Sequence, residues 1–150
     1  MNVMEIKIRS IEHNGLAPDL PRRASTGSAG VDLQAMIDAP LTLEPQKLYR
    51  VPTGIAMELP EGYVGLVYAR SGLGVKHGIA LGNGVGVIDS DYRGEIQVGL
   101  CNLSDTPYTI APLDRIAQLV IAPVPPVEYV WAEELSDTAR GEGGFGSSGR

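Results

Sequence analysis

The sequence predicts a single all-β domain, a sandwich or barrel, and three observations predict it. The chain has 150 residues, of which 19 are Gly and 11 are Pro, a turn-rich composition that disfavours a helical bundle. Short apolar runs are separated by Gly, Pro, Asn or Asp at intervals of about 8–12 residues, as in β-sandwiches and barrels. The first run, Met4–Ile11, alternates apolar and polar residues like a half-buried strand.

The remaining elements are expected in order along the chain. The strands are Val31–Ala35, Leu41–Leu43, Leu48–Val51, Gly54–Glu58, Tyr63–Ala69, Val85–Ile88, Ile96–Leu100, Tyr108–Ile110, Ile116–Ala122 and Val127–Trp131. One short helix is expected at Ser71–His77, with Ser71 as its N-cap. The helix-forming residues of Ala132–Ala139 are too few for a second one. Arg140–Arg150 has five glycines in eleven residues and is expected to be a mobile arm.

Composition excludes several classes of function. The net charge of −6 disfavours a nucleic-acid-binding surface. The single Cys excludes a disulfide framework and a cysteine-based zinc site. No apolar run approaches the roughly 20 residues that span a bilayer. The N-terminal segment lacks the apolar core of a signal peptide, so the expected location is the cytoplasm.

The segment Ala69–Gly74 closes an expected strand and opens the short helix. A Ser-Gly turn presents backbone N–H groups and a hydroxyl, and the guanidinium of Arg70 can bind a phosphate through two hydrogen bonds. The alternative is an ordinary strand-to-helix turn with an exposed, salt-bridging Arg70.

The segment Gly82–Glu95 combines a turn signal with a carboxylate. Asn83-Gly84 predicts a hairpin, and the glycines allow close approach of a flat ligand. Asp89 follows two β-branched residues at a strand end, where it could act as general base on a water molecule. The alternative is that Asp89 and Asp91 only turn the chain, since two acids this close are weak evidence for a metal.

Two further features need explanation. Gln118 lies within an apolar strand and needs hydrogen-bond partners if it points inward; alternatively, it sits on an edge strand and faces water. Phe145, the only Phe, and Arg140 lie in the glycine-rich tail, which suggests a lid whose ring stacks on a base and whose guanidinium meets phosphate. The alternative is a disordered linker. No role is expected for Cys101, a buried apolar side chain, or for His13, which should be exposed.

Together these segments resemble the five ordered motifs of the trimeric deoxyuridine triphosphatases (dUTPases). The motifs are Ala29–Ala35, Ala69–Gly72 continuing to Gly78-Ile79, Gly82–Glu95, Arg115–Val120 and Arg140–Gly149. The match runs from about residue 25 to the C-terminus, some four-fifths of the chain. Two departures are mild: Ala69 stands where many members have Pro, and Ser147-Ser148 where Ser-Thr is common.

The resemblance implies a distorted jelly-roll-like β-barrel or sandwich with one short helix. Residues 1–139 would form the β domain, and residues 140–150 the arm that closes over an active site. It also implies a homotrimer with three active sites shared between subunits, and no nucleic acid or membrane partner. The implied reaction converts dUTP and water to dUMP and pyrophosphate with Mg²⁺, which keeps dUTP low and supplies dUMP for dTTP synthesis.

The resemblance also implies residue roles. Asp89 is the general base, and Gln118 contacts the α-phosphate region or the attacking water. Asp32 either holds Mg²⁺ through water or orients a motif Arg, with no direct protein ligand to the metal. The other expected substrate contacts fall into three sets. The phosphates are contacted by Arg70, Ser71 and Gly72, and the nucleoside by Asn83, Val87, Ile88 and Gln97 on uracil and by Tyr92 under the sugar. The arm contributes Arg140, Phe145, Gly146, Ser147 and Ser148.

Three rival interpretations stay open. A dCTP deaminase or bifunctional deaminase-dUTPase shares the fold but needs a different carboxylate arrangement after the Arg-Ser pair. A non-catalytic nucleotide-binding module has no need for Asp89. A purely structural trimer predicts that Phe145→Ala changes nothing measurable.

Overall fold

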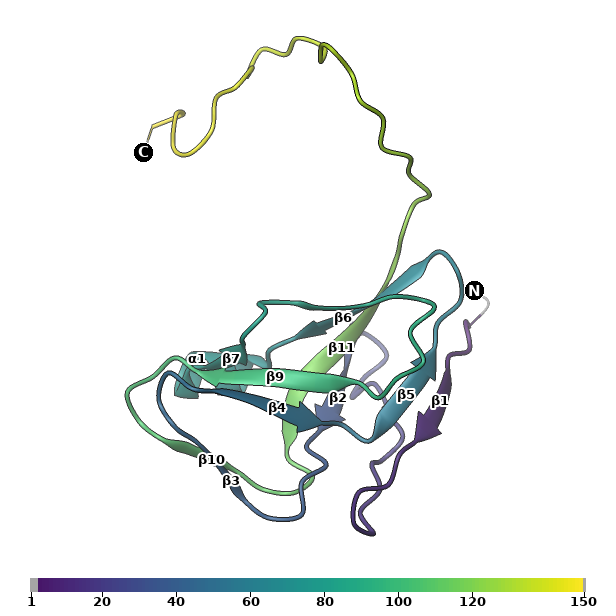
Figure 1. The fold of residues 1–150 in the computed structure, drawn as a ribbon, viewed down its shortest axis with the longest axis vertical. Coiled ribbons are helices and arrows are strands. Elements are labelled where there is room, and N and C mark those ends of the chain that lie inside the picture. The colour runs from purple at the N-terminus through teal and green to yellow at the C-terminus, as the bar shows by residue number, and fades with distance from the viewer. Residues whose placement is uncertain (1–2, 150) are drawn as a thin grey trace.

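A computed structural model describes residues 3–149, which form a compact β body followed by a long extended segment (Figure 1). The elements in chain order are β1 (Lys7–Ser10), β2 (Gly30–Gln34), β3 (Leu41–Leu43), β4 (Leu48–Pro52), β5 (Ile55–Glu58), β6 (Tyr63–Tyr68), α1 (Ser71–His77), β7 (Ile79–Leu81), β8 (Gly86–Ile88), β9 (Gln97–Asn102), β10 (Tyr108–Ile110) and β11 (Arg115–Pro123). The all-β class with one short helix, a jelly-roll-like fold, is therefore confirmed.

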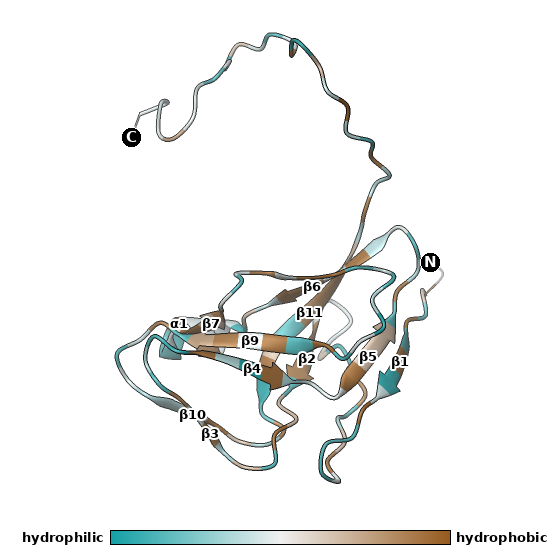
Figure 2. Cartoon of the chain, in the orientation of Figure 1, coloured by the Kyte–Doolittle hydropathy of each residue, from teal (hydrophilic) through white to brown (hydrophobic). Residues whose placement is uncertain are grey.

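The strands form four antiparallel sheets around one core. Two larger sheets have the orders β2-β11-β6-β8 and β4-β9-β7, and two small ones pair β1 with β5 and β10 with β3. Figure 2 shows hydrophobic residues concentrated in the strands of the body. Leu33, Val67, Ile88, Leu100 and Ile116 belong to a single buried apolar cluster that draws on both larger sheets. This core fixes the strands whose ends carry the polar groups of the site.

Strand β11 lies between β2 and β6, so Gln118 is on a central strand. It pairs with Asp32 on one side and with Tyr68 on the other. The edge-strand alternative for Gln118 is therefore wrong. The pairing shifts between Arg115 and Ala117, a β-bulge that redirects the side chains at this end of the sheet.

Some element predictions need correction. Ile79–Leu81 forms β7, a strand the sequence pattern did not indicate. Val127–Trp131 is not a strand, because two prolines precede it and no strand within residues 3–149 pairs with it. Ser71 is not the N-cap of α1: Arg70 occupies that position with an extended backbone and no side-chain cap.

After β11 the chain leaves the body and runs through the space beyond it (Figure 1). Its apolar side chains are uncovered within this chain: Trp131 and Phe145 are fully exposed. Residue 150, the last of the expected arm, lies outside the described residues. Over residues 3–149, no helix has the length and apolar character needed to cross a membrane.

Candidate functional site

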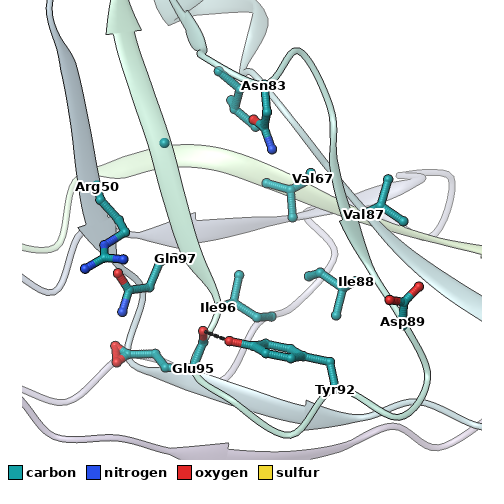
Figure 3. Close-up of a pocket in the computed structure, with 13 residues that line it drawn as sticks. Arg50, Val67, Asn83, Val87, Ile88, Asp89, Tyr92, Glu95, Ile96 and Gln97 are labelled. Atoms are coloured by element: carbon teal, nitrogen blue, oxygen red, sulfur yellow. Dashed lines mark hydrogen bonds between the residues drawn. The ribbon is translucent and has the colours of Figure 1, made fainter.

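A pocket of about 360 Å³ collects much of the predicted site. It is open to solvent and lies between the loop that follows β7, strand β8 and the start of β9 (Figure 3). Six of its lining residues were predicted from the sequence, namely Asn83, Val87, Ile88, Asp89, Tyr92 and Gln97. Figure 3 shows the Asp89 carboxylate on one side of the pocket, with Arg50, Glu95 and Gln97 on the other.

Asn83-Gly84 makes a tight turn, although the hairpin predicted there is wrong. The Gly84 N–H donates to the carbonyl of Leu81 at 2.9 Å, and Gly84 has φ +75°, a conformation that favours glycine. The flanking strands do not pair with each other, since β7 pairs with β9 and β8 pairs with β6. The turn thus carries Asn83 from one sheet to the other and leaves its side chain facing the pocket (Figure 3).

The loop from Asp89 to Glu95 is closed by its own hydrogen bonds. The Tyr92 N–H donates to the Asp89 carbonyl at 3.1 Å, and the Arg93 guanidinium donates to the Ser90 carbonyl at 2.6 Å. The Tyr92 hydroxyl donates to the Glu95 carbonyl at 2.8 Å, the dashed contact in Figure 3. The aromatic ring is consequently fixed in the lining of the pocket, and Asp89 directly follows the paired strand β8.

A second polar group forms at the end of β6, where side chains of β2 and of the central strand β11 join it. Arg70 Nε donates to Asp32 Oδ1 at 2.8 Å, and Arg115 donates to Asp32 Oδ2 at 3.4 Å. The Gln118 amide donates to the Ala69 carbonyl at 2.9 Å. Asp32 and Arg70 are about one-third exposed, so solvent partly screens their ion pair. Asp32 therefore holds the guanidinium of Arg70 in one orientation, at the start of α1.

Ser71 and Gly72 are exposed in the first turn of α1, directly after this group. The arm residues lie elsewhere. Arg140 Nε donates to the Gly143 carbonyl at 2.6 Å, and the Ser147 N–H donates to the Gly144 carbonyl at 3.0 Å, so this part of the arm is a series of turns. Within one chain the predicted site residues thus form three separate groups: the pocket, the arginine group and the arm.

Comparison with known proteins identifies the family. The dUTPase family profile matches residues 17–149. The chain belongs to the dUTPase family. A deoxyuridine 5'-triphosphate nucleotidohydrolase from Desulfitobacterium hafniense is 52% identical over 150 residues, which cover 99% of each chain.

Solved dUTPase structures share the fold. The dUTPase of Staphylococcus bacteriophage 80alpha, solved with dUpNHpp, has a TM-score of 0.87 and 30% identity and covers 99% of this chain and 100% of its own. A mutant dUTPase from phage phi11 of S. aureus has a TM-score of 0.78 and 26% identity, covering 89% of this chain and 100% of its own. It is described in terms of the coordination of a structural Mg(II) ion.

Four side chains that contact site residues or line the pocket were not assigned a role from the sequence. Arg50 and Glu95 line the pocket, and Arg115 binds Asp32. His13, expected to be exposed, is half-buried and contacts the Glu95 carboxylate. Arg115 and Glu95 lie inside motifs that the sequence did indicate. His13 and Arg50 lie outside them, and no local signal identifies either.

A divalent cation such as Mg²⁺ needs several oxygen ligands close together. Among the described residues, no group of three His, Cys, Asp or Glu side chains is close enough to form a metal cage. Both oxygens of Asp32 accept hydrogen bonds from arginines. Mg²⁺ binds oxygen ligands and typically retains several waters, with substrate phosphates among its ligands. A magnesium ion at this site would need oxygen ligands from a bound polyphosphate and from water besides any that the chain supplies.

Proposed function

We propose that this chain hydrolyses dUTP to dUMP and pyrophosphate by attack of water on the α-phosphorus, with Asp89 as the general base. The main support is the pocket, which sets a carboxylate at the end of β8 beside backbone and amide groups suited to a flat base. A base must lie within hydrogen-bond reach of the proton it removes, and a carboxylate that follows a paired strand is held in position. Keeping dUTP low and supplying dUMP for dTTP synthesis is the corresponding physiological role.

The pocket supports selection for uracil and deoxyribose. The Asn83 amide and the backbone of Val87 and Ile88 supply donors and acceptors that can match the O4 and N3–H pattern of uracil, and Gln97 adds a further amide. Tyr92, held by its hydrogen bond to the Glu95 carbonyl, would lie under the sugar and leave no room for a 2′-hydroxyl. Sites that leave buried polar groups unpaired with the wrong ligand can discriminate by roughly 10⁴-fold or more.

The arginine group supports binding of the triphosphate. Arg70, oriented by Asp32, would contact phosphate oxygens together with the Ser71 hydroxyl and the Gly72 N–H. Gln118 donates to the Ala69 carbonyl through its nitrogen, so its oxygen remains available to orient the attacking water. Bound Mg²⁺ would neutralise charge on the phosphates. The protein residues contribute chiefly position and charge, which suits phosphoryl chemistry.

The separation of the groups supports sites shared between subunits of a homotrimer. Ile88 pairs with Gly65 near the start of β6, so Asp89 lies at that end of the strand. Arg70 follows the opposite end of β6, five residues beyond Gly65, roughly 16 Å away along an extended chain. A single chain therefore directs its base and its phosphate-binding arginine to different places. The arm, with Phe145 for the base and Arg140, Gly146, Ser147 and Ser148 for the phosphates, would close over a site of other subunits.

Replacing Asp89 with Asn tests the assignment. Asn keeps the shape of the side chain but cannot accept a proton, so kcat for dUTP should fall by roughly 10²–10⁴-fold while the substrate still binds. Pyrophosphate release measures turnover, and dUTP binding is measured by calorimetry. Asp91→Asn, an exposed acid two residues along the same loop, is the matched control and should stay near the rate of the unmodified chain.

Substrate profiling separates the rival functions. Pyrophosphate should be released from dUTP and not from dCTP, dTTP or UTP at comparable rates. Ammonia release from dCTP would instead identify a deaminase. Tight dUTP binding without any pyrophosphate would identify a non-catalytic binder. An unchanged rate for Asp89→Asn would show that another group takes the proton.

A further inference from the structure

Glu95 is a largely buried carboxylate at the foot of the pocket loop. Its side chain is 12% exposed, and the residue lines the pocket. His13 Nε2 lies 2.6 Å from one carboxylate oxygen and 2.9 Å from the other. The Gly54 N–H donates to the first oxygen at 3.3 Å. An ionised carboxylate only accepts hydrogen bonds, so His13 Nε2 carries the proton in this contact.

His13 reaches Glu95 from a segment 82 residues away in the sequence. Reciprocal backbone hydrogen bonds with Leu16, both 2.9 Å, form the turn that carries it. The Ile11 N–H donates to the Gly54 carbonyl at 2.6 Å, which fixes the N-terminal segment to the residue that also binds Glu95. The N-terminal segment, the turn before β5 and the pocket loop therefore meet at one carboxylate.

Glu95 in turn determines the position of Tyr92. Its carbonyl accepts the hydrogen bond of the Tyr92 hydroxyl at 2.8 Å. The ring also packs so closely on Gly94 that a Cβ there would overlap it. Any outward shift of Glu95 would consequently move the ring. Without His13, the Glu95 carboxylate keeps only the long hydrogen bond from the Gly54 N–H. A buried carboxylate with so few partners is unfavourable, and a shift of Glu95 towards water would relieve this cost.

We propose that His13 is a positioning residue for sugar discrimination, acting through Glu95 to hold Tyr92 against a ribose 2′-hydroxyl. This inference rests on the proposed hydrolysis of dUTP and goes beyond it, because His13 lies outside every dUTPase motif of the chain. It does not touch the substrate. Its role is to keep the Tyr92 ring in the position that admits deoxyribose only.

The test compares kcat/KM for dUTP and for UTP in His13→Ala and His13→Gln. The dUTP-over-UTP ratio should fall by about tenfold in His13→Ala, the size of one hydrogen bond to a charged group. His13→Gln keeps a side-chain N–H and should recover most of the ratio. Asp38→Ala is the matched control, since it removes the other tether of the same turn, the 2.8 Å hydrogen bond from Asn14, and should leave the ratio unchanged.

A double-mutant cycle with Glu95→Gln tests whether His13 acts on the dUTP-over-UTP ratio through Glu95. In that background His13→Ala should cause little further change in the ratio. An equal fall in both backgrounds would overturn the role of Glu95, and an unchanged ratio in His13→Ala would overturn the inference. If the unmodified chain releases no pyrophosphate from dUTP, the proposed function itself fails, so the two failures are distinguishable.

Discussion

Replacing Asp32 with Asn decides between its two expected roles, holding Mg²⁺ through water or orienting a motif arginine. The structure favours the second, since Arg70 Nε donates to Oδ1 at 2.8 Å and Arg115 donates to Oδ2 at 3.4 Å. Asn is nearly isosteric and keeps one oxygen acceptor, but it removes the charge. Arg70 would then be held by one hydrogen bond to an uncharged oxygen and by its contact with the Arg115 carbonyl.

The magnitude follows from the exposure of the pair. The side chains of Arg70 and Asp32 are 28% and 34% exposed, so after screening the ion pair contributes at most about 1 kcal/mol to folding. For a chain of this size that lowers the melting temperature by roughly 2–4 °C. A charge-assisted contact to phosphate is worth about 1.5–3 kcal/mol, or roughly 10- to 100-fold in kcat/KM. The loss in kcat/KM should lie near the lower end of this range for Asp32→Asn and near its upper end for Asp32→Ala.

The assay measures kcat/KM for dUTP over a series of Mg²⁺ concentrations, together with a thermal melt. If Asp32 orients Arg70, the loss is the same at every Mg²⁺ concentration, and the half-saturating Mg²⁺ concentration does not move. Asp19→Asn is a matched control, because the Asp19 carboxylate accepts a hydrogen bond from Gln34 on the same strand, whereas the Asp32 carboxylate accepts from Arg70 and Arg115. Restoration of Asp32→Asn to the original rate by excess Mg²⁺ would refute the orienting role, as would an unchanged kcat/KM in Asp32→Ala.

Two predictions concern the arm and the assembly. Deleting Arg140–Arg150 should shift the melting temperature by no more than about 2 °C, because residues 140–149 bury little apolar surface, yet it should reduce kcat for dUTP at least about tenfold. Full turnover by the truncated chain would refute the lid. Mixing Asp89→Asn chains with truncated chains should restore part of the lost activity, because a mixed trimer can combine an intact Asp89 with an intact arm. Absence of rescue, with subunit exchange verified by mass spectrometry, would count against shared sites.

The sequence predicts the fold where the signal is local. Alternation and turn residues indicate most of the strands, and Ser71–His77 is the helix expected. The missed strand β7, at Ile79–Leu81, has only three residues directly after a helix, and it exists because β9 offers a partner. Val127–Trp131 shows the converse, since a strand-like pattern without a partner in the chain does not become a strand.

In the site, too, the sequence indicates what is local and does not indicate contacts between distant segments. Asp89, Asn83 and Tyr92 lie in one short motif, and in the structure all three line one pocket. The pairing of Asp32 with Arg70 depends on β11 bringing β2 and β6 together, which no single segment reveals. His13 is the extreme case, because its partner Glu95 is 82 residues away and neither residue alone signals the contact.

Two of the three groups of the site, the arginine group and the pocket, are held by related arrangements. In each, a group expected to touch the substrate is positioned by an acidic residue, and a cationic or N–H-bearing side chain from a distant segment binds that acid. Asp32 orients Arg70 through its carboxylate and also binds Arg115, while Glu95 holds Tyr92 through its backbone carbonyl and binds His13 through its carboxylate. Phosphoryl transfer asks for position and charge more than for covalent chemistry. Replacing a supporting residue such as Asp32 should therefore cost more free energy in transition-state binding, measured from kcat/KM, than in the free energy of unfolding.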